Sequence, residues 1–235
     1  MHARRSTRNQ IPRSARRAGT VVAAFALILL ATACAPTRFE ASSDIPQPLL
    51  ERIPVVVGMH LPQEFREKVY EEKREQGGGE YIIGLGKAQT AGFTRILNAM
   101  FERVVEVSTP AAAAATDAAI RGVLEPALDD VAFVTPIDSG TSTYAVSLRY
   151  SVRLYSPQGE LVETWTFTGY GSQPASMFPG KGDEALAAAT RTALRDAGAK
   201  LAAEFREQAI ARGLIPSSQP APPAEVQLPL PARQL

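Results

Sequence analysis

Alternation of apolar and polar residues predicts a long β-hairpin in the second half of the chain. Between residues 144 and 154 every second side chain is apolar, which is the period of a strand with one buried face and one wet face. Residues 156–159 carry proline in second place and glycine in fourth, as a type I turn prefers. Residues 161–168 then return, with Trp165 and Phe167 on one side. We therefore expect two antiparallel strands joined by a tight turn.

Two segments have the spacing of amphipathic helices. In the first, over residues 88–101, the apolar side chains recur at helical intervals and share one face. They are Phe93, Ile96, Leu97, Met100 and Phe101. The second helix is predicted over residues 183–212, with Asp183 as its N-cap and Gly213 as its stop signal. Its apolar stripe consists of Leu186, Ala189, Ala193, Leu194, Ala197, Leu201 and Phe205.

Shorter patterns supply the remaining elements. Apolar or alternating runs predict strands at residues 54–59, 81–83, 104–107 and 119–125, the last continuing over 129–134 beyond a kink at Pro126. The highly charged residues 62–76 fit a surface helix or an ordered excursion, and the alanine run at 111–115 fits one helical turn or a loop. The expected fold class is α+β: a two-layer sandwich in which one mixed or antiparallel sheet, with its long hairpin, is backed by the two main helices.

The first 33 residues have the three-part layout of an export signal. Six arginines lie within residues 4–17, an uncharged apolar run covers residues 21–30, and small side chains fill positions 31–33. The apolar stretch measures about 15 residues, whereas a membrane-spanning helix needs roughly 20. We therefore assign residues 1–33 to a signal peptide.

Cys34 follows this segment directly. The sequence Leu-Ala-Thr-Ala-Cys at residues 30–34 resembles the lipobox of bacterial lipoproteins, in which the cysteine thiol receives a diacylglycerol and a peptidase cuts just before it. An ordinary A-x-A site at residues 31–33 would be cut at the same bond. Cysteine usage separates the two interpretations, because a single cysteine cannot form an internal disulfide and a lone exported thiol is a liability. We predict Cys34 to be the lipid attachment site.

The mature chain divides into three parts. Residues 34–52 are largely polar with three prolines, and they are predicted to be a tether that spans up to about 60 Å and lets the domain stand clear of the lipid headgroups. Residues 53–212 form the globular α/β domain. Residues 213–235, rich in proline, glutamine and alanine, are predicted to be a disordered tail that hangs free or lies along a partner.

Composition narrows the choice of partners. The formal net charge is +1, but residues 1–33 hold six basic and no acidic residues, so the mature part keeps 19 basic against 24 acidic residues, a net charge of −5. Nucleic-acid binding needs a concentrated basic face, and none is visible in the pattern. We expect a membrane contact through the N-terminal lipid, an envelope protein as partner, and no nucleic acid.

Few residues in the mature part could carry catalysis. With Cys34 acylated, the exported domain keeps one histidine, His60, and no thiol, which argues against a cysteine nucleophile or a multi-histidine metal site, so we expect no metal and no cofactor. Gly84-Leu85-Gly86-Lys87 lacks the remaining residues of a phosphate-binding loop and is better explained as a tight start of a helix. The acidic pairs 71–72 and 129–130 are more often solvated surface than acid/base pairs.

One stretch is a candidate contact surface. Residues 169–182 are interrupted by glycine and proline and carry Tyr170, Met177 and Phe178, whereas Trp165 just before them belongs to the core. Large apolar side chains on such a segment are typical of a binding patch. We name these three residues as possible partner contacts.

The whole order of elements, from the lipobox to the closing helix, resembles small periplasmic lipoproteins. The groups it is most similar to are the auxiliary lipoproteins of ABC-type lipid transporters and lipoproteins with a TolB-amino-terminal-like α/β fold; the likeness covers residues 53–212. It implies an outer-membrane address on the periplasmic face, because Ala35 and Pro36 follow the cysteine in place of the aspartate that retains such proteins at the inner membrane. The leading hypothesis is a non-enzymatic envelope component, followed by a lipid- or glycan-binding module and then by a carboxylate-dependent hydrolase.

Overall fold

The computed structural model describes residues 36–42, 51–75 and 79–211, with side chains up to Phe205. Cys34, the signal peptide, residues 43–50 of the predicted tether and the predicted tail at 213–235 lie outside the described residues. Within the described part no helix is long and apolar enough to cross a membrane.

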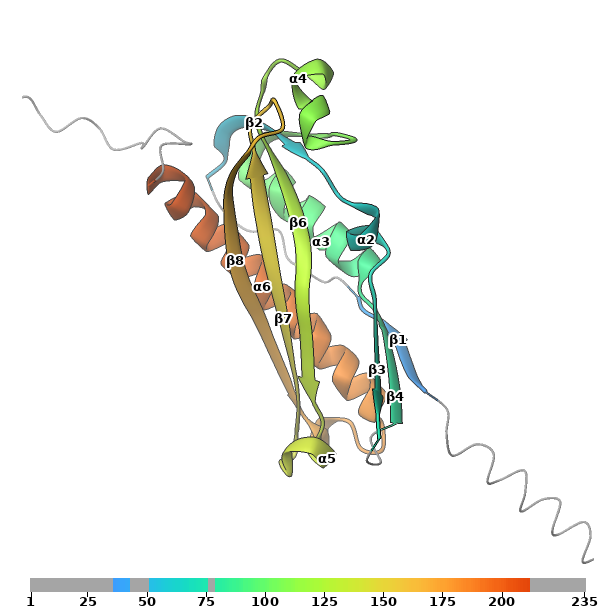
Figure 1. The fold of residues 1–235 in the computed structure, drawn as a ribbon. Coiled ribbons are helices and arrows are strands. Elements are labelled where there is room, and N and C mark those ends of the chain that lie inside the picture. The colour runs from blue at the N-terminus through green and yellow to red at the C-terminus, as the bar shows by residue number, and fades with distance from the viewer. Residues whose placement is uncertain (1–35, 43–50, 76–78, 212–235) are drawn as a thin grey trace, which may run out of the picture.

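A five-stranded mixed sheet forms the centre of the fold (Figure 1). Its order is β5 (Phe101–Glu106), β2 (Ile53–Met59), β6 (Ile120–Val134), β7 (Thr143–Tyr155) and β8 (Leu161–Pro174). Strand β2 runs parallel to both of its neighbours, while β6, β7 and β8 are antiparallel. The predicted hairpin is confirmed as β7 and β8, and both strands are longer than the pattern indicated because pairing continues from Ser147 opposite Tyr170 to Thr143 opposite Pro174.

Two long helices cover one face of this sheet. They are α3 (Gly86–Met100) and α6 (Gly182–Ala211), which agrees with the two predicted helices and confirms the two-layer α+β class. Every member of both predicted apolar stripes is buried. Phe101 differs only in that it begins β5 instead of ending the helix. In Figure 1 both helices lie behind β6, β7 and β8, whose other face is turned to the viewer.

Glycines in β8 let α6 approach the sheet closely. A Cβ at Gly169 would overlap the backbone of Ala193 and Ala197, and one at Gly171 would overlap the backbone of Ala189 and Ala193. The sequence interpretation had placed both glycines in an exposed contact stretch. The structure places them in a buried contact, because a strand glycine opposite helical alanines removes the side chains that would hold the two layers apart.

A smaller, three-stranded sheet lies beside the lower half of β6. Its order is β1 (Thr37–Glu40), β4 (Gly79–Gly84) and β3 (Val69–Arg74), with β1 parallel and β3 antiparallel to β4. Residues 62–76, expected to be a helix or an excursion, therefore form only the four-residue helix α2 (Gln63–Arg66) before turning into β3. Its charged residues mark an edge strand with an exposed face.

Strand β1 falls inside the segment predicted to be a tether. Phe39 packs against the core, Ala41 is buried, and the amide of Ala41 donates to the carbonyl oxygen of Gly84 at 2.8 Å. Arg191 of α6 also donates to the hydroxyl of Ser42. The folded domain thus begins at Thr37 and not at residue 53.

Strand β6 is continuous where a kink was expected at Pro126. Pro126 pairs with Val152, and the register shift comes later, between Leu128 and Asp130. Strand β2 ends opposite Leu124, so Pro126 lies where β6 has lost one neighbour and a missing amide donor is tolerated. The bulge keeps Leu128 and Val131 on the same, helix-covered face of the strand.

Short elements close the two ends of the sheet. The upper end carries η2 (Pro110–Ala112) and α4 (Ala113–Thr116), where the alanine run forms one turn of each kind. The lower end carries α5 (Pro136–Ser139) between β6 and β7 and η3 (Ala175–Met177) between β8 and α6. The sandwich is elongated along β7, β8 and α6 (Figure 1).

Candidate functional site

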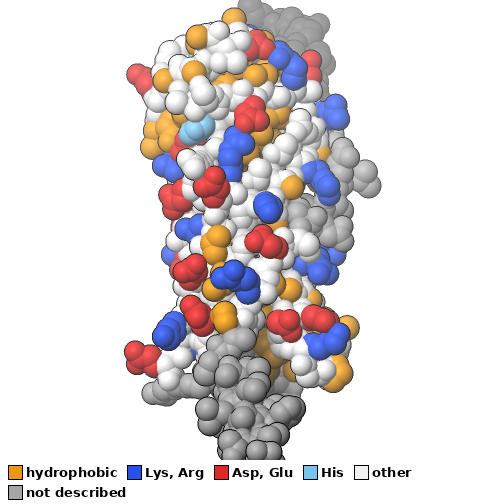
Figure 2. All heavy atoms as spheres, turned by 90° about the vertical axis from the view of Figure 1, so that its right-hand side faces the viewer, with side chains coloured by type: hydrophobic (Ala, Val, Ile, Leu, Met, Phe, Trp, Pro, Cys, Tyr) orange, Lys and Arg blue, Asp and Glu red, His pale blue; other side chains and the backbone are white. Residues whose placement is uncertain are grey.

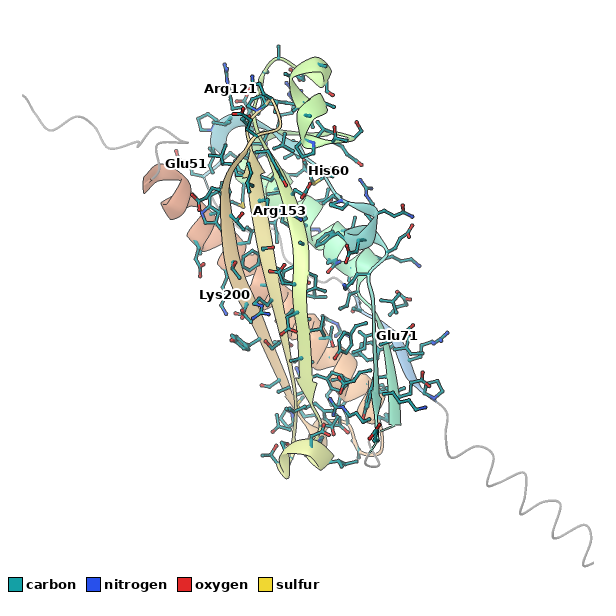
Figure 3. The ribbon with its side chains drawn as sticks, viewed as in Figure 1. Glu51, His60, Glu71, Arg121, Arg153 and Lys200 are labelled. Atoms are coloured by element: carbon teal, nitrogen blue, oxygen red, sulfur yellow. The ribbon has the colours of Figure 1, made fainter. Side chains whose placement is uncertain are left out.

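A polar cluster occupies the face of the sheet that the helices leave uncovered. Glu125 of β6 is its centre, with a side chain that is only 8% exposed. Its carboxylate lies 2.5 Å from Nδ1 of His60, accepts a hydrogen bond from the Tyr155 hydroxyl at 3.2 Å, and pairs with the Arg153 guanidinium at 3.1 Å. His60 and Arg153 are seen close together beside β6 and β7 in Figure 3.

Strand register brings these four residues together. Glu125 is paired directly with Arg153 across β6 and β7, and Tyr155 lies two residues further along the same face. The amide of His60 donates to the carbonyl oxygen of Leu124 at 3.0 Å, which fixes the histidine next to Glu125 at the end of β2. His60 is thus packed at the end of β2 beside the buried carboxylate of Glu125.

The cluster can hold a charge and tie strands together. Burial and the neighbouring Glu125 raise the pKa of the Tyr155 hydroxyl, which keeps it a hydrogen-bond donor. Within the described residues, neither ring nitrogen of His60 is hydrogen-bonded to a hydroxyl or thiol. The same residues hold no group of three potential metal ligands. The neighbouring hollow beside Pro126 and Lys68 measures about 70 Å³, far below the several hundred Å³ of a small-molecule site.

The helix start at Gly84–Gly86 does not bind an anion through its first amides. The backbone amides of Leu85 and Gly86 both donate to the carbonyl oxygen of Lys68 at 2.9 Å. A Cβ at Gly86 would overlap the backbone of Arg66. The glycine serves the close approach of α2 and α3, as the sequence interpretation favoured.

Three of the four carboxylates in the acidic pairs considered from sequence, Glu72, Asp129 and Asp130, form ion pairs or hydrogen bonds. Glu72 accepts from Tyr70 at 2.6 Å and from Arg74 at 2.5 Å, and burial together with the bond to Glu72 raises the pKa of Tyr70 to about 12. Asp129 accepts from Ser151, and Asp130 lies 3.9 Å from Arg149. Neither pair meets in a shared cleft among the described residues.

A second network of charged residues holds the small sheet to the lower end of the large one. Arg74 of β3 forms an ion pair with Asp138 of α5, donates to the carbonyl oxygen of Phe133 and lies over the rings of Tyr81 and Phe133. Burial alone would raise the pKa of Asp138, but hydrogen bonds from Thr135 and the pair with Arg74 outweigh it and lower that pKa. The carboxylate of Asp138 is therefore a fixed part of this junction.

The predicted contact residues are separated in space. Tyr170 is 60% exposed on the uncovered face of β8, where Nζ of Lys200 lies 4.8 Å from its ring centre. Met177 is 66% exposed in η3 at the lower end, and Phe178 beside it is half-buried. Pro174 and the end of β8 lie between them, so Tyr170 is about 13 Å of strand away from η3.

Comparisons with known proteins give structural similarity only. No family model matches the chain, and no curated protein sequence matches it. A crystal structure from Xanthomonas campestris, described as a member of the DUF330 family, is 14% identical, covers 77% of this chain and 98% of its own, and has a TM-score of 0.44. A minor lipoprotein from Acinetobacter baumannii is 11% identical, covers 72% of this chain and all of its own, and has a TM-score of 0.41.

The uncovered face of β6, β7 and β8 is the largest feature that sequence reasoning missed. Residues paired across the three strands form rows on this face, and most of their side chains are short or carry a hydroxyl group, with one ion pair among them. They are Ala127, Ser151 and Thr166; Asp130, Arg149 and Thr168; Ala132, Ser147 and Tyr170. The alternation in β7 indicated one wet face, but the extent of this surface depends on three strands pairing in register, which a single sequence does not reveal.

Proposed function

We propose that this chain is a bacterial envelope lipoprotein, acylated on Cys34, that acts by binding another envelope protein and not by catalysis. The anchor is supported by residues 30–34 and by the use of a single cysteine. Ala35 and Pro36 favour the outer membrane and its periplasmic face.

The observation that supports a binding role best is the uncovered face of the large sheet. Below the part of this face that η2, α4 and α2 contact, the rows from Asp130 to Tyr170 form a surface that neither long helix covers, with Tyr170 60% exposed on it. Short side chains leave the backbone accessible to a partner, and an exposed tyrosine is among the side chains most often found at the centre of protein interfaces. The hollow beside the Glu125 cluster, at about 70 Å³, is too small to favour ligand binding on this face.

The anchor is tested by Cys34→Ser. We expect the variant to move from the membrane fraction to the soluble periplasmic fraction, because acyl chains contribute about 0.8 kcal/mol per buried methylene and nothing else is needed to retain the protein. Mass spectrometry of the mature wild-type protein should find fatty acyl groups on its first residue. Unchanged membrane association of the variant would contradict the anchor.

The docking face is tested by Ser147→Arg, which puts a long charged side chain on the middle strand of that face, next to Tyr170. The expected result is loss of a stoichiometric protein partner when the lipidated protein is captured from detergent-solubilised envelope. Ala199→Arg, on the exposed side of α6, is the matched control and should keep the partner. Co-purification of lipid without protein would instead favour a lipid-binding module.

A further inference from the structure

The folded domain starts three residues after Cys34 and not after a tether of 19 residues. Strand β1 begins at Thr37, so only Ala35 and Pro36 separate it from the acylated residue. Three residues of extended chain span at most about 11 Å. The start of β1 is therefore held within that distance of the lipid anchor, and the orientation of the domain is restricted.

The start of β1 lies at the lower end of the elongated fold. Thr37 pairs with Tyr81 near the beginning of β4. A groove of about 430 Å³ joins Pro36 and Thr37 to Ile137 of α5 and to Gly182 at the beginning of α6. The connections from β6 to β7 and from β8 to α6 are at this same end (Figure 1).

This lower end carries the two most exposed large hydrophobic side chains of the described part. Ile137 of α5 is 74% exposed and Met177 of η3 is 66% exposed. Two ion pairs lie near them, Arg74 with Asp138 and Lys181 with Glu184. Figure 2 shows orange hydrophobic side chains among red and blue ones at the lower end of the molecule.

We propose that this lower end lies against the bilayer, with Ile137 and Met177 inserted among the lipid headgroups. The proposal rests on the acylation of Cys34 proposed above. Moving apolar side chains out of water lowers the free energy. A short covalent link also keeps these side chains at a high effective concentration next to the membrane, so a weak intrinsic affinity for lipid is enough for binding. The ion pairs limit the number of unpaired charges brought to the lipid.

The orientation also places the other end of the molecule. Strand β8 has 14 residues and α6 has 30, and each is about 45 Å long. The turn between β7 and β8 therefore stands roughly that far from the headgroups. A reporter at Ser176, beside Met177, and one at Gln158, in that turn, would sit in different environments.

The test uses the lipidated full-length mature protein on vesicles of phosphatidylethanolamine and phosphatidylglycerol. Its only native cysteine is consumed by the lipid, so Ser176→Cys or Gln158→Cys can be labelled selectively with an environment-sensitive fluorophore. Both positions are exposed and polar. With nitroxide-bearing lipids in the vesicles, the label at 176 should be quenched several-fold more than the label at 158.

Removal of the apolar side chains provides the second measurement. Ile137→Ser combined with Met177→Ser should weaken quenching at position 176 while the protein stays on the vesicles. Leu161→Ser combined with Val162→Ser changes two exposed apolar residues at the opposite end and should leave the quenching unaltered. Vesicle-bound protein whose 176 label is no more quenched than its 158 label overturns the orientation and leaves this end to a protein partner. Absence of the mature protein from the vesicles overturns the anchor and the orientation together.

Discussion

At the scale of single residues, glycine sets the distance between the two layers. Gly171 faces the backbone of α6 where any side chain would overlap Ala189 and Ala193. Well-packed interiors transmit such an overlap into shifts of backbone and neighbouring side chains. Position 171 therefore tolerates only glycine without a shift of the backbone, although it lies near the end of an edge strand.

Gly171→Ala should destabilise the domain by about 1–3 kcal/mol, because α6 must move away from β8 to admit the methyl group. The free energy of urea-induced unfolding measures the effect. Ser172→Ala, the next residue on the exposed face of the same strand, should change that free energy by about 0.5 kcal/mol or less. Equal effects of the two substitutions would show that the close approach does not limit packing.

Asp138 should make part of the stability dependent on acid pH. Its pKa is lower in the folded state than in the unfolded chain, so its contribution is fully present above the unfolded value of about 4 and is lost as the pH falls through the folded value. We expect Asp138→Asn to reduce the decline in unfolding free energy between about pH 5 and pH 2. Glu160→Gln, an exposed change in the hairpin turn, should leave the pH dependence of the unfolding free energy the same as in the wild type.

At the scale of elements, α6 protects the free edge of the sheet. Strand β8 is the outermost strand, and an unpaired edge of 14 residues is a template for pairing with other chains. The carboxylate of Asp196 accepts a hydrogen bond from the amide of Tyr170 at 2.8 Å, and Nζ of Lys200 donates to the carbonyl oxygen of Thr168 at 2.6 Å. Their ion pair, also 2.8 Å long, holds both side chains over the edge.

Asp196→Ala combined with Lys200→Ala should leave these backbone groups free for another chain. In sedimentation velocity experiments on the soluble Cys34→Ser form, we expect the double variant to form concentration-dependent dimers or larger species. The Cys34→Ser protein without the double substitution should not associate further as its concentration rises. Arg195→Ala combined with Glu204→Ala removes the same charges from exposed positions of α6 and should not promote association. If both double variants associate equally, the edge contacts have no protective role.

The elements differ in how visible they are in the sequence. The hairpin and both helices were predictable because each repeats one period over ten or more residues. Strand β1 was not, since it has four residues, one of them a large apolar side chain, and depends on pairing with residues more than 40 positions away. The Glu125 cluster was equally hidden, because it depends on register between strands and on the place where β2 ends.

At the scale of the whole molecule, β1 makes the segment next to the proposed anchor part of the fold. A soluble domain that begins at Glu51 should unfold at a temperature roughly 5 °C or more below one that begins at Pro36, because the shorter chain loses the burial of Phe39 and Ala41. Thermal unfolding followed by circular dichroism compares the two. Equal unfolding temperatures would show that residues 37–42 do not stabilise the domain and act only as a tether.

The course of α6 sets where anything attached beyond it is presented. The helix begins at Gly182, next to the first residues of β1, and its 30 residues carry the chain to the far end of the sandwich. In the proposed membrane orientation, a fluorescent protein or affinity tag joined downstream of this helix would be displayed on the side pointing into the aqueous compartment. Such fusions should leave acylation undisturbed and remain open to antibodies and proteases on intact vesicles.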